Sequence, residues 1–449
     1  MTVTDSEIPY CRYTQTLAAS LTRQKTMKLF FLIGYSLFLC SVSNAQSDSL
    51  YQTLIAKAGL LHLQKSYKSA ITYYEQAFQI QQPDALTAYK AAGMYSLDSN
   101  AIKSFQYLHL SITSGWTEAD WLLFDPYFDY LRNTYPEKWK MISRTALVAE
   151  SQYEYTLQLP ALRKEIILMT LNDQKLRYQK IQTKNDSDRM SINKQITKSD
   201  LSNMSRAKDI IKQYGWLKIS QIGKDGQNNL WLIVQHADQD VLFQQTALKA
   251  MEKLQRTKEV NMENYAFLYD RAQCNLNYKQ RYGTQVEWTN NGEASAFRPI
   301  LKEYMTDERR EKIGLQPLQI YALTYGFNYH TICMKQSNKK DRDYKAQVLL
   351  LIDSAKYCYD IKQYQKTYDF YNNASTFLGG MSNADNFEAA IIFSKIAFVN
   401  NDEKYKSIAL DFLDLLFLRG SLNKKQLKQQ PFKILYNDPR WLEMNKRLN

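Results

Sequence analysis

Apolar residues recur at helical spacing near both ends of the chain. Near the N-terminus, two successive helix faces carry Leu54, Ala58 and Leu61, then Tyr67, Ala70, Tyr74 and Ala77. Near the C-terminus, large and small apolar residues return in similar order as Leu351, Ala355, Tyr364, Tyr371 and Ala374. Steps of three and four residues place side chains on one face of a helix. Both ends are therefore predicted to form antiparallel helical hairpins, with small residues where two helices approach closely.

A similar tail follows each set of predicted helices. Gly115 closes one apolar run and Pro126 follows eleven residues later, and Gly420 and Pro431 repeat that spacing. Aromatic residues come after each proline, namely Tyr127 and Phe128, and then Phe432. A spacing shared by two distant segments is typical of helical-repeat proteins. Because a stack of repeats leaves one apolar face open at its end, we interpret each tail as a cap.

These two ends resemble tetratricopeptide repeats, and their tails resemble the segment that closes some bacterial arrays of such repeats. The tails read Asp125-Pro126-Tyr127-Phe128 and Gln430-Pro431-Phe432. The resemblance implies a concave face that binds an unidentified protein or peptide partner. The alternative is that two hairpins at each end only pack on the centre, since at least three repeats are normally needed for independent stability.

The segment between the ends breaks this pattern. Helices are predicted at about Pro160–Lys180, Asp209–Tyr214 and Phe243–Leu254, whereas residues 181–205 read as a loop or an exposed helix. Leu230–His236 is an apolar run that fits a strand or a helix. Asn291-Gly292, between two short apolar runs, predicts a β-hairpin with a type I′ turn.

The predicted fold class is mainly α, with tetratricopeptide-like hairpins at both ends and a mostly helical centre carrying a small β-hairpin. The predicted domains are residues 46–150, 155–325 and 326–449. Gly (14) and Pro (9) are scarce among 449 residues while Tyr (33) is abundant, which favours packed helices over a turn-rich β-sandwich.

Residues 1–45 have the pattern of a secretory signal peptide that starts at Met27. Basic residues precede the apolar run Leu29–Val42, and Ser43-Asn44-Ala45 offers small residues before a cleavage point. The run is shorter than the roughly 20 residues that span a bilayer, so no transmembrane span is expected in the mature chain. The protein is predicted to be exported, either periplasmic or secreted. The alternative is a lipoprotein anchored through Cys40.

The formal net charge of +13 is spread along the chain, so solvated helix faces explain it better than a nucleic-acid partner. Cys274, Cys333 and Cys358 remain after the predicted cleavage and contain no C-x-x-C pair, which favours small buried side chains over disulfides. One histidine and one cysteine in the centre cannot form the usual structural zinc site. Phosphate-binding and dinucleotide-binding glycine motifs are missing from the sequence. We therefore predict neither a metal nor a cofactor.

The centre resembles an uncharacterised bacterial domain over roughly residues 160–322. The resemblance rests on short motifs in a fixed order: Asp173-Gln174, Gly215-Trp216, Gln235-His236-Ala237-Asp238, Leu268-Tyr269-Asp270-Arg271, Tyr282-Gly283-Thr284-Gln285, and Arg309-Arg310 with Gly314-Leu315. It implies a shared fold and supplies no reaction.

Polar residues within these motifs are the candidate site. His236 and Asp270 are the candidate acid–base residues, because imidazole titrates near neutral pH and a carboxylate can orient it. The candidate ligand-binding residues are Gln235, Asp238, Gln244, Arg271, Tyr282, Gln285, Arg309 and Arg310. Arginine suits a carboxylate or phosphate, and glutamine suits a polar ligand.

Each candidate also has a structural interpretation. Asp238 or Asp240 caps the helix that starts near Val241, Asp270 pairs with Arg309 or Arg310, and His236 is a core histidine.

Two functions remain open at this stage. The first is an exported interaction scaffold whose central domain binds a polar ligand. The alternative is a hydrolase of an envelope or extracellular substrate with His236 as acid or base. The hydrolase requires His236, Asp270, Gln285 and one of Arg309 or Arg310 to line one cavity.

Overall fold

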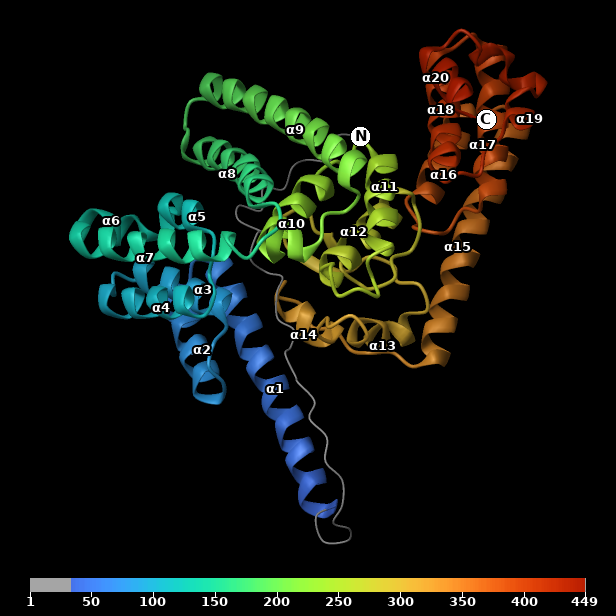
Figure 1. Cartoon of the computed structure of the whole chain (residues 1–449). Coiled ribbons are helices and arrows are strands. Elements are labelled where there is room, and N and C mark those ends of the chain that lie inside the picture. The colour runs from blue at the N-terminus through green and yellow to red at the C-terminus, as the bar shows by residue number, and fades with distance from the viewer. Residues whose placement is uncertain (1–33, 449) are drawn as a thin grey trace.

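The computed structural model describes residues 34–448, with side chains from residue 47 onward. The fold is mainly α with one small β-hairpin, which confirms the predicted fold class. Figure 1 shows the N-terminal helices α1–α7 and the C-terminal helices α15–α20 on opposite sides of a central group, α8–α14. The central group therefore contacts both ends of the chain.

The N-terminal group is built from pairs of helices joined by short turns. Its elements are α1 (Gly34–Leu63), α2 (Tyr67–Ile80), α3 (Ala85–Leu97), α4 (Ala101–Thr113), α5 (Ala119–Phe124), the 3-10 helix η1 (Pro126–Phe128), α6 (Asp129–Thr134) and α7 (Pro136–Glu154). Helix α1 packs on α2, and α3 packs on α4. The Asp84 and Asn100 side chains accept backbone N–H groups and so fix the starts of α3 and α4.

The predicted signal segment lies mostly outside the described residues. Of residues 1–45, only the backbone of residues 34–45 is described, and it forms the start of α1. Across residues 34–448, no helix is long and apolar enough to cross a bilayer.

The central group contains α9, a long and mostly exposed helix. The elements of this group are α8 (Pro160–Gln182), α9 (Asp186–Tyr214), α10 (Ile219–Gln235), α11 (Val241–Glu252), α12 (Met262–Asn275), β1 (Val286–Trp288), β2 (Ala294–Phe297), the 3-10 helix η2 (Glu303–Met305), α13 (Thr306–Glu311) and α14 (Leu318–Leu323). Residues 181–205, open between loop and helix in the sequence, lie mostly in α9, and Leu230–His236 ends α10. The Asp240 side chain caps α11 by accepting the Phe243 N–H at 3.0 Å.

The β-hairpin lies where Asn291-Gly292 predicts it. Strands β1 and β2 pair antiparallel, with Val286 opposite Phe297. Gly292 has φ +78°, a left-handed conformation that glycine adopts without steric cost. The predicted type I′ turn is wrong, because Asn291 does not have the positive φ that such a turn requires. The Gly292 N–H instead donates to the Thr289 carbonyl oxygen at 2.9 Å, across a turn centred on residues 290–291. The hairpin is followed by a loop that returns to the central core at Ile300.

The C-terminal group repeats the paired arrangement. Its elements are α15 (Met334–Asp360), α16 (Tyr364–Ser375), α17 (Asn383–Asn400), α18 (Glu403–Leu418), α19 (Lys424–Leu427), the 3-10 helix η3 (Gln430–Leu435) and α20 (Pro439–Arg447). Helix α15 packs on α16, and α17 packs on α18. The buried aromatic residues Tyr371 and Phe393 contact each other between the pairs.

Buried apolar side chains gather separately in the three groups. One cluster joins α8–α12 and α14, another joins α15–α20, and smaller ones fill the N-terminal hairpins. Helix α8 belongs to two of them, since Ile166 packs in the central cluster and Leu171 in an N-terminal one. The bounds proposed for the domains stay a prediction.

Candidate functional site

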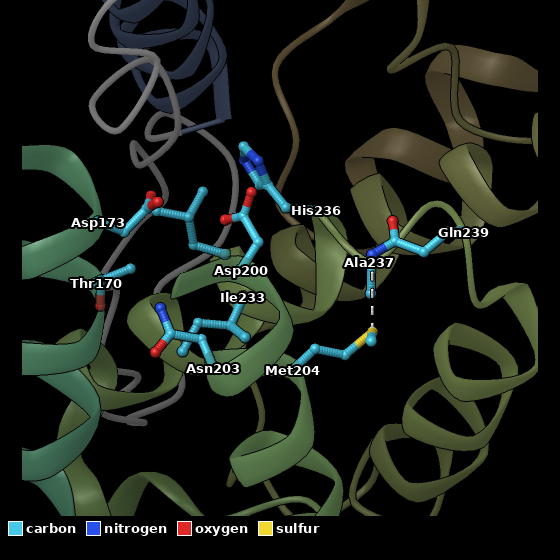
Figure 2. A pocket seen from close by; sticks show the side chains of 10 residues that line it. Thr170, Asp173, Asp200, Asn203, Met204, Ile233, His236, Ala237 and Gln239 are labelled. Atoms are coloured by element: carbon cyan, nitrogen blue, oxygen red, sulfur yellow. Dashed lines mark hydrogen bonds between the residues drawn. The ribbon is translucent and has the colours of Figure 1, made fainter. Parts of the chain in front are cut away.

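A small cavity lies beside His236 in the central group. Figure 2 shows the side chains around it, which come from α8, α9 and the end of α10. The lining residues are Thr170, Asp173, Asp200, Asn203, Met204, Leu232, Ile233, His236, Ala237 and Gln239. The cavity volume is about 20 Å³. One water molecule needs roughly 10–15 Å³ of such space, so the cavity holds one water or one group of similar size.

Two carboxylates in this cavity share one guanidinium group. On α8, the Arg177 Nε donates to Asp173 Oδ2 at 2.9 Å, which the four-residue step between them allows. The Arg177 Nη2 donates to Asp200 Oδ1 on α9, also at 2.9 Å. Arg177 therefore ties α8 to α9 and partly neutralises both acids.

Asp173 keeps one oxygen without a partner. Its Oδ2 accepts from Arg177 and from the Gln174 amide at 3.1 Å. Its Oδ1 is buried and has no hydrogen-bond partner among the described residues. The residue is only 7% exposed, so the free oxygen is an acceptor held away from bulk solvent at the cavity wall. Leaving such an oxygen unpaired costs about 1–3 kcal/mol, which a ligand that donates a hydrogen bond would recover.

Opposite effects act on the two titratable neighbours of Asp173. Burial and the Asp173 carboxylate raise the pKa of Asp200 to about 6, although Arg177 opposes this shift. Asp173 acts through its charge and through a side-chain hydrogen bond that a protonated Asp200 can donate to it, so Asp173 is left with its free acceptor when Asp200 is ionised. Loss of solvent around the imidazole lowers the pKa of His236, and the positive charges of Arg271 and Arg177 lower it further. His236 nevertheless reaches the surface at the end of α10. At neutral pH the cavity therefore faces a neutral imidazole and mainly ionised carboxylates.

The candidates next to His236 in sequence form a separate cluster. Asp238 accepts from the Arg271 Nε at 2.7 Å, from the Asn275 amide at 2.9 Å and from the Gln244 amide at 3.3 Å. Gln244 also donates to the Gln235 carbonyl oxygen at 3.2 Å. The structure thus brings together four predicted ligand-binding residues, and the donors among them already occupy the Asp238 carboxylate.

Asp270 lies in a different place, inside the central core. It is 0% exposed and accepts backbone N–H groups from Arg281 at 2.7 Å, Tyr282 at 3.1 Å and Thr284 at 3.0 Å. The Thr284 hydroxyl donates to the same carboxylate at 3.0 Å. These contacts make Asp270 an anchor for the loop that precedes the β-hairpin. Asp270 is absent from the lining of the His236 cavity.

The remaining predicted residues also contact other parts of the described structure: Tyr282 is buried in the central core, and the others form hydrogen bonds. Gln285 donates its amide to the Thr284 hydroxyl at 3.1 Å, and Arg309 donates to the carbonyl oxygen of Leu301 at 2.7 Å. Arg310 donates to the carbonyl oxygens of Tyr282 and Gln316, each at 2.7 Å. None of these side chains lines the cavity beside His236. The single-cavity arrangement that the hydrolase hypothesis requires is therefore not present among residues 34–448.

Sequence reasoning missed Thr170, Asp173, Arg177, Asp200 and Asn203 as site residues, although Asp173 lies in one of the motifs. Arg177 carried a usable signal, since it follows Asp173 by one helical turn on the same face. Asp200 carried none, because it sits in a long polar stretch with many similar residues. Only the packing of α8 against α9 brings Asp200 to Asp173.

Comparison with known proteins finds a family match for the central segment. Residues 160–330 match DUF6624, a family of unknown function. This match agrees with the resemblance to an uncharacterised domain over nearly the same residues, and it includes every residue that lines the His236 cavity. No curated protein and no solved structure matches the chain. We refer below to residues 160–330 as the DUF6624 segment.

The match supplies no reaction, and nothing in it favours the hydrolase alternative. Within the described part of the chain, no group of three or more His, Cys, Asp or Glu side chains is arranged to hold a metal ion.

Proposed function

We propose that this protein is an exported helical scaffold whose DUF6624 segment binds a small hydrogen-bond donor, best an ammonium group, in the cavity beside His236. The observation that carries the proposal is the buried Asp173 Oδ1, which lines the cavity without a partner. Export is supported by the signal-like pattern of residues 1–45, and a protein or peptide partner by the helical hairpins at both ends.

The local charge favours a cation over an anion. Asp173 and Asp200 supply two carboxylates, whereas Arg177 supplies one guanidinium group. With His236 neutral, one negative charge is left uncompensated when Asp200 is ionised. A donor cation placed near Asp173 Oδ1 would balance this charge and satisfy the unpaired oxygen.

The size of the cavity selects the ligand group. A volume of about 20 Å³ admits an ammonium group but not a whole sugar or nucleotide. The bound group is therefore the end of a larger molecule or a small amine. Its remainder leaves along the exposed side, where His236 and Gln239 reach the surface.

Methylammonium tests this proposal directly. Because a ligand that binds only the folded state stabilises it, we expect methylammonium chloride to raise the melting temperature of the wild type by roughly 2–4 °C at saturating concentration. Asp173→Asn removes the charged acceptor and should abolish the increase. Sodium chloride at equal ionic strength corrects for general salt effects.

Glu165→Gln is the matched control. Glu165 also joins α8 to α9, since its Oε1 accepts from the Arg206 Nε at 2.6 Å, yet it lies outside the cavity. This variant should keep the methylammonium response. A wild type without a response, or equal responses in the wild type and Asp173→Asn, would contradict the proposal.

A further inference from the structure

A second cavity lies where the N-terminal helices meet the DUF6624 segment. Helix α1 packs beside α14 there, as Figure 1 also shows. The cavity has a volume of about 70 Å³ and is lined from one side by Gln52, Gly59 and Lys90. Glu263 and Arg310 line it from the other side. Since one water needs roughly 10–15 Å³, this space admits a molecule of about five non-hydrogen atoms.

Arg310 is buried in the wall of this cavity and keeps one N–H donor group without a partner. It is 0% exposed, and its guanidinium carbon lies 4.7 Å from the centre of the Tyr321 ring. The Nε and Nη1 groups donate to carbonyl oxygens of Gln316 and Tyr282, each at 2.7 Å. The Nη2 group has no hydrogen-bond partner among the described residues. A fixed, buried guanidinium group with a free N–H is suited to bind a carboxylate.

Acceptors face the same space. The Gln52 Oε1 is buried without a hydrogen-bond partner among the described residues. Glu263 lines the cavity and forms no ion pair with Arg310 in the described structure, although the two charges interact electrostatically. Burial raises the pKa of Glu263 to about 7, despite the opposing charges of Arg310 and Lys224. The cavity therefore offers a donor for an anion at Arg310. It offers acceptors for a neighbouring polar hydrogen at Glu263 on the same side and at Gln52 on the opposite side.

We propose that this cavity binds a small carboxylate whose adjacent carbon carries a hydroxyl or ammonium group. The ligand carboxylate accepts from the Arg310 Nη2, and the adjacent group donates to Gln52 Oε1 or Glu263. Lys90, on the opposite side from Arg310, adds positive charge to the cavity and favours an anionic ligand. Because the walls come from α1 and α3 on one side and from α12–α14 on the other, the bound molecule holds the N-terminal helices against the DUF6624 segment.

Gly59 allows the cavity to be blocked without touching a polar residue. A Cβ atom added at Gly59 meets nothing within 4 Å, and the residue lies inside α1. Gly59→Leu places an apolar side chain in the cavity, and Gly59→Ala leaves most of the space open. Both changes raise helix propensity, so neither is expected to unfold the protein.

Glycolate is the first probe, with acetate, glycine and methylammonium as comparisons. We expect glycolate to raise the melting temperature of the wild type by roughly 2–4 °C at saturation. Acetate, which lacks the adjacent donor, should give a smaller increase, and methylammonium should act only through the His236 cavity. Glycine, whose ammonium group takes the place of the hydroxyl, should raise the melting temperature more than acetate does.

Gly59→Leu should lose the glycolate response and Gly59→Ala should keep it. Gln52→Leu removes an unpaired acceptor and should narrow the difference between glycolate and acetate while the protein stays folded. Asp173→Asn should leave the glycolate response intact, so a failure here is distinct from a failure at the His236 cavity. The proposal is overturned if the wild type ignores glycolate or if Gly59→Leu responds as strongly as the wild type.

Discussion

At the scale of single residues, the carboxylates of the DUF6624 segment differ in how completely they are hydrogen-bonded. Asp270 accepts three backbone N–H groups and a hydroxyl, and Asp238 accepts from Arg271, Asn275 and Gln244. Asp173 alone among these three keeps a buried oxygen without a partner in the described structure. An acid whose oxygens are all occupied fixes backbone or side chains, whereas a free buried oxygen can bind a ligand.

Asp200 should make the stability of the protein depend on pH. Its pKa of about 6 in the folded state lies above the ordinary value of 3.8, so the folded protein binds more protons between these values. The free energy of unfolding should therefore fall as the pH rises from 4 to 7. Asp200→Asn should make the free energy of unfolding depend less on pH between 4 and 7. Urea unfolding at each pH measures this free energy.

The control for this measurement is Asp188→Asn, which removes an exposed carboxylate from the same helix but outside the cavity. Its curve should keep the wild-type slope between pH 4 and 7. Parallel curves for the wild type and Asp200→Asn would show that Asp200 ionises alike in folded and unfolded chains.

At the scale of elements, the two Gly-to-Pro tails adopt the same local structure. Gly115 follows α4 with φ +103° and Gly420 follows α18 with φ +64°, a region that favours glycine. Pro126 and Pro431 then lie at the start of the 3-10 helices η1 and η3. Each tail also buries an aromatic ring completely, Phe128 in the first and Phe432 in the second. The interpretation of these tails as caps stays a prediction.

Phe432→Ala should test how much the second tail stabilises the C-terminal helices. The ring is 0% exposed and contacts Phe387 and Trp441 at ring-centre distances of 5.7 and 5.8 Å. Removing a buried phenylalanine costs about 3–5 kcal/mol through lost burial and a residual cavity. Urea unfolding of the whole chain should show this loss.

Phe398→Ala is the comparison for that experiment, because Phe398 is 73% exposed on α17. It should change the free energy of unfolding by less than about 0.5 kcal/mol. Similar effects of the two substitutions would mean that the tail contributes little to the stability of these helices.

At the scale of the whole molecule, two arginines join the three groups of helices. Arg163 on α8 is 0% exposed and pairs with Glu150 of α7 at 3.0 Å, which links the N-terminal group to the centre. Arg419 follows α18 and donates to the carbonyl oxygens of Leu276 at 2.8 Å and Asn277 at 3.0 Å. Its guanidinium carbon also lies 4.4 Å from the centre of the Tyr278 ring. The ends of the chain are thus attached to the DUF6624 segment by specific contacts.

Arg419→Ala should loosen the C-terminal group from the centre. The loss of charged hydrogen bonds to two carbonyl oxygens should weaken this contact by about 2–3 kcal/mol. Hydrogen–deuterium exchange should then accelerate around Leu276–Lys279 and in the facing residues 375–380.

Arg440→Ala provides the control, because Arg440 pairs with Asp411 at 2.7 Å inside the C-terminal group. It should leave exchange at residues 276–279 unchanged. If Arg419→Ala also leaves that exchange unchanged, the contact between the C-terminal group and the DUF6624 segment does not depend on this side chain.

The sequence by itself determined the local elements of this protein. Helical spacing predicted the hairpins at both ends and a helix from Pro160, observed as α8, and Asn291-Gly292 predicted the β-hairpin. These features depend on residues close together in the chain, where periodicity, capping and turn chemistry act. Residues 181–205 stayed ambiguous because most of α9 is exposed, so few apolar residues mark its buried face.

Only the tertiary structure decided which side chains share a cavity. Asp173, Asp200 and His236 come from three helices. Gln52 and Arg310 line one cavity between the N-terminal helices and the DUF6624 segment. Helical periodicity shows which face of a helix is buried. It does not show which other helix packs against that face. The predicted polar residues therefore separate into an Asp238 cluster, a loop anchored by Asp270 and a wall built by Arg310. The cavity beside His236 instead depends on Asp200, which the sequence did not distinguish from its neighbours.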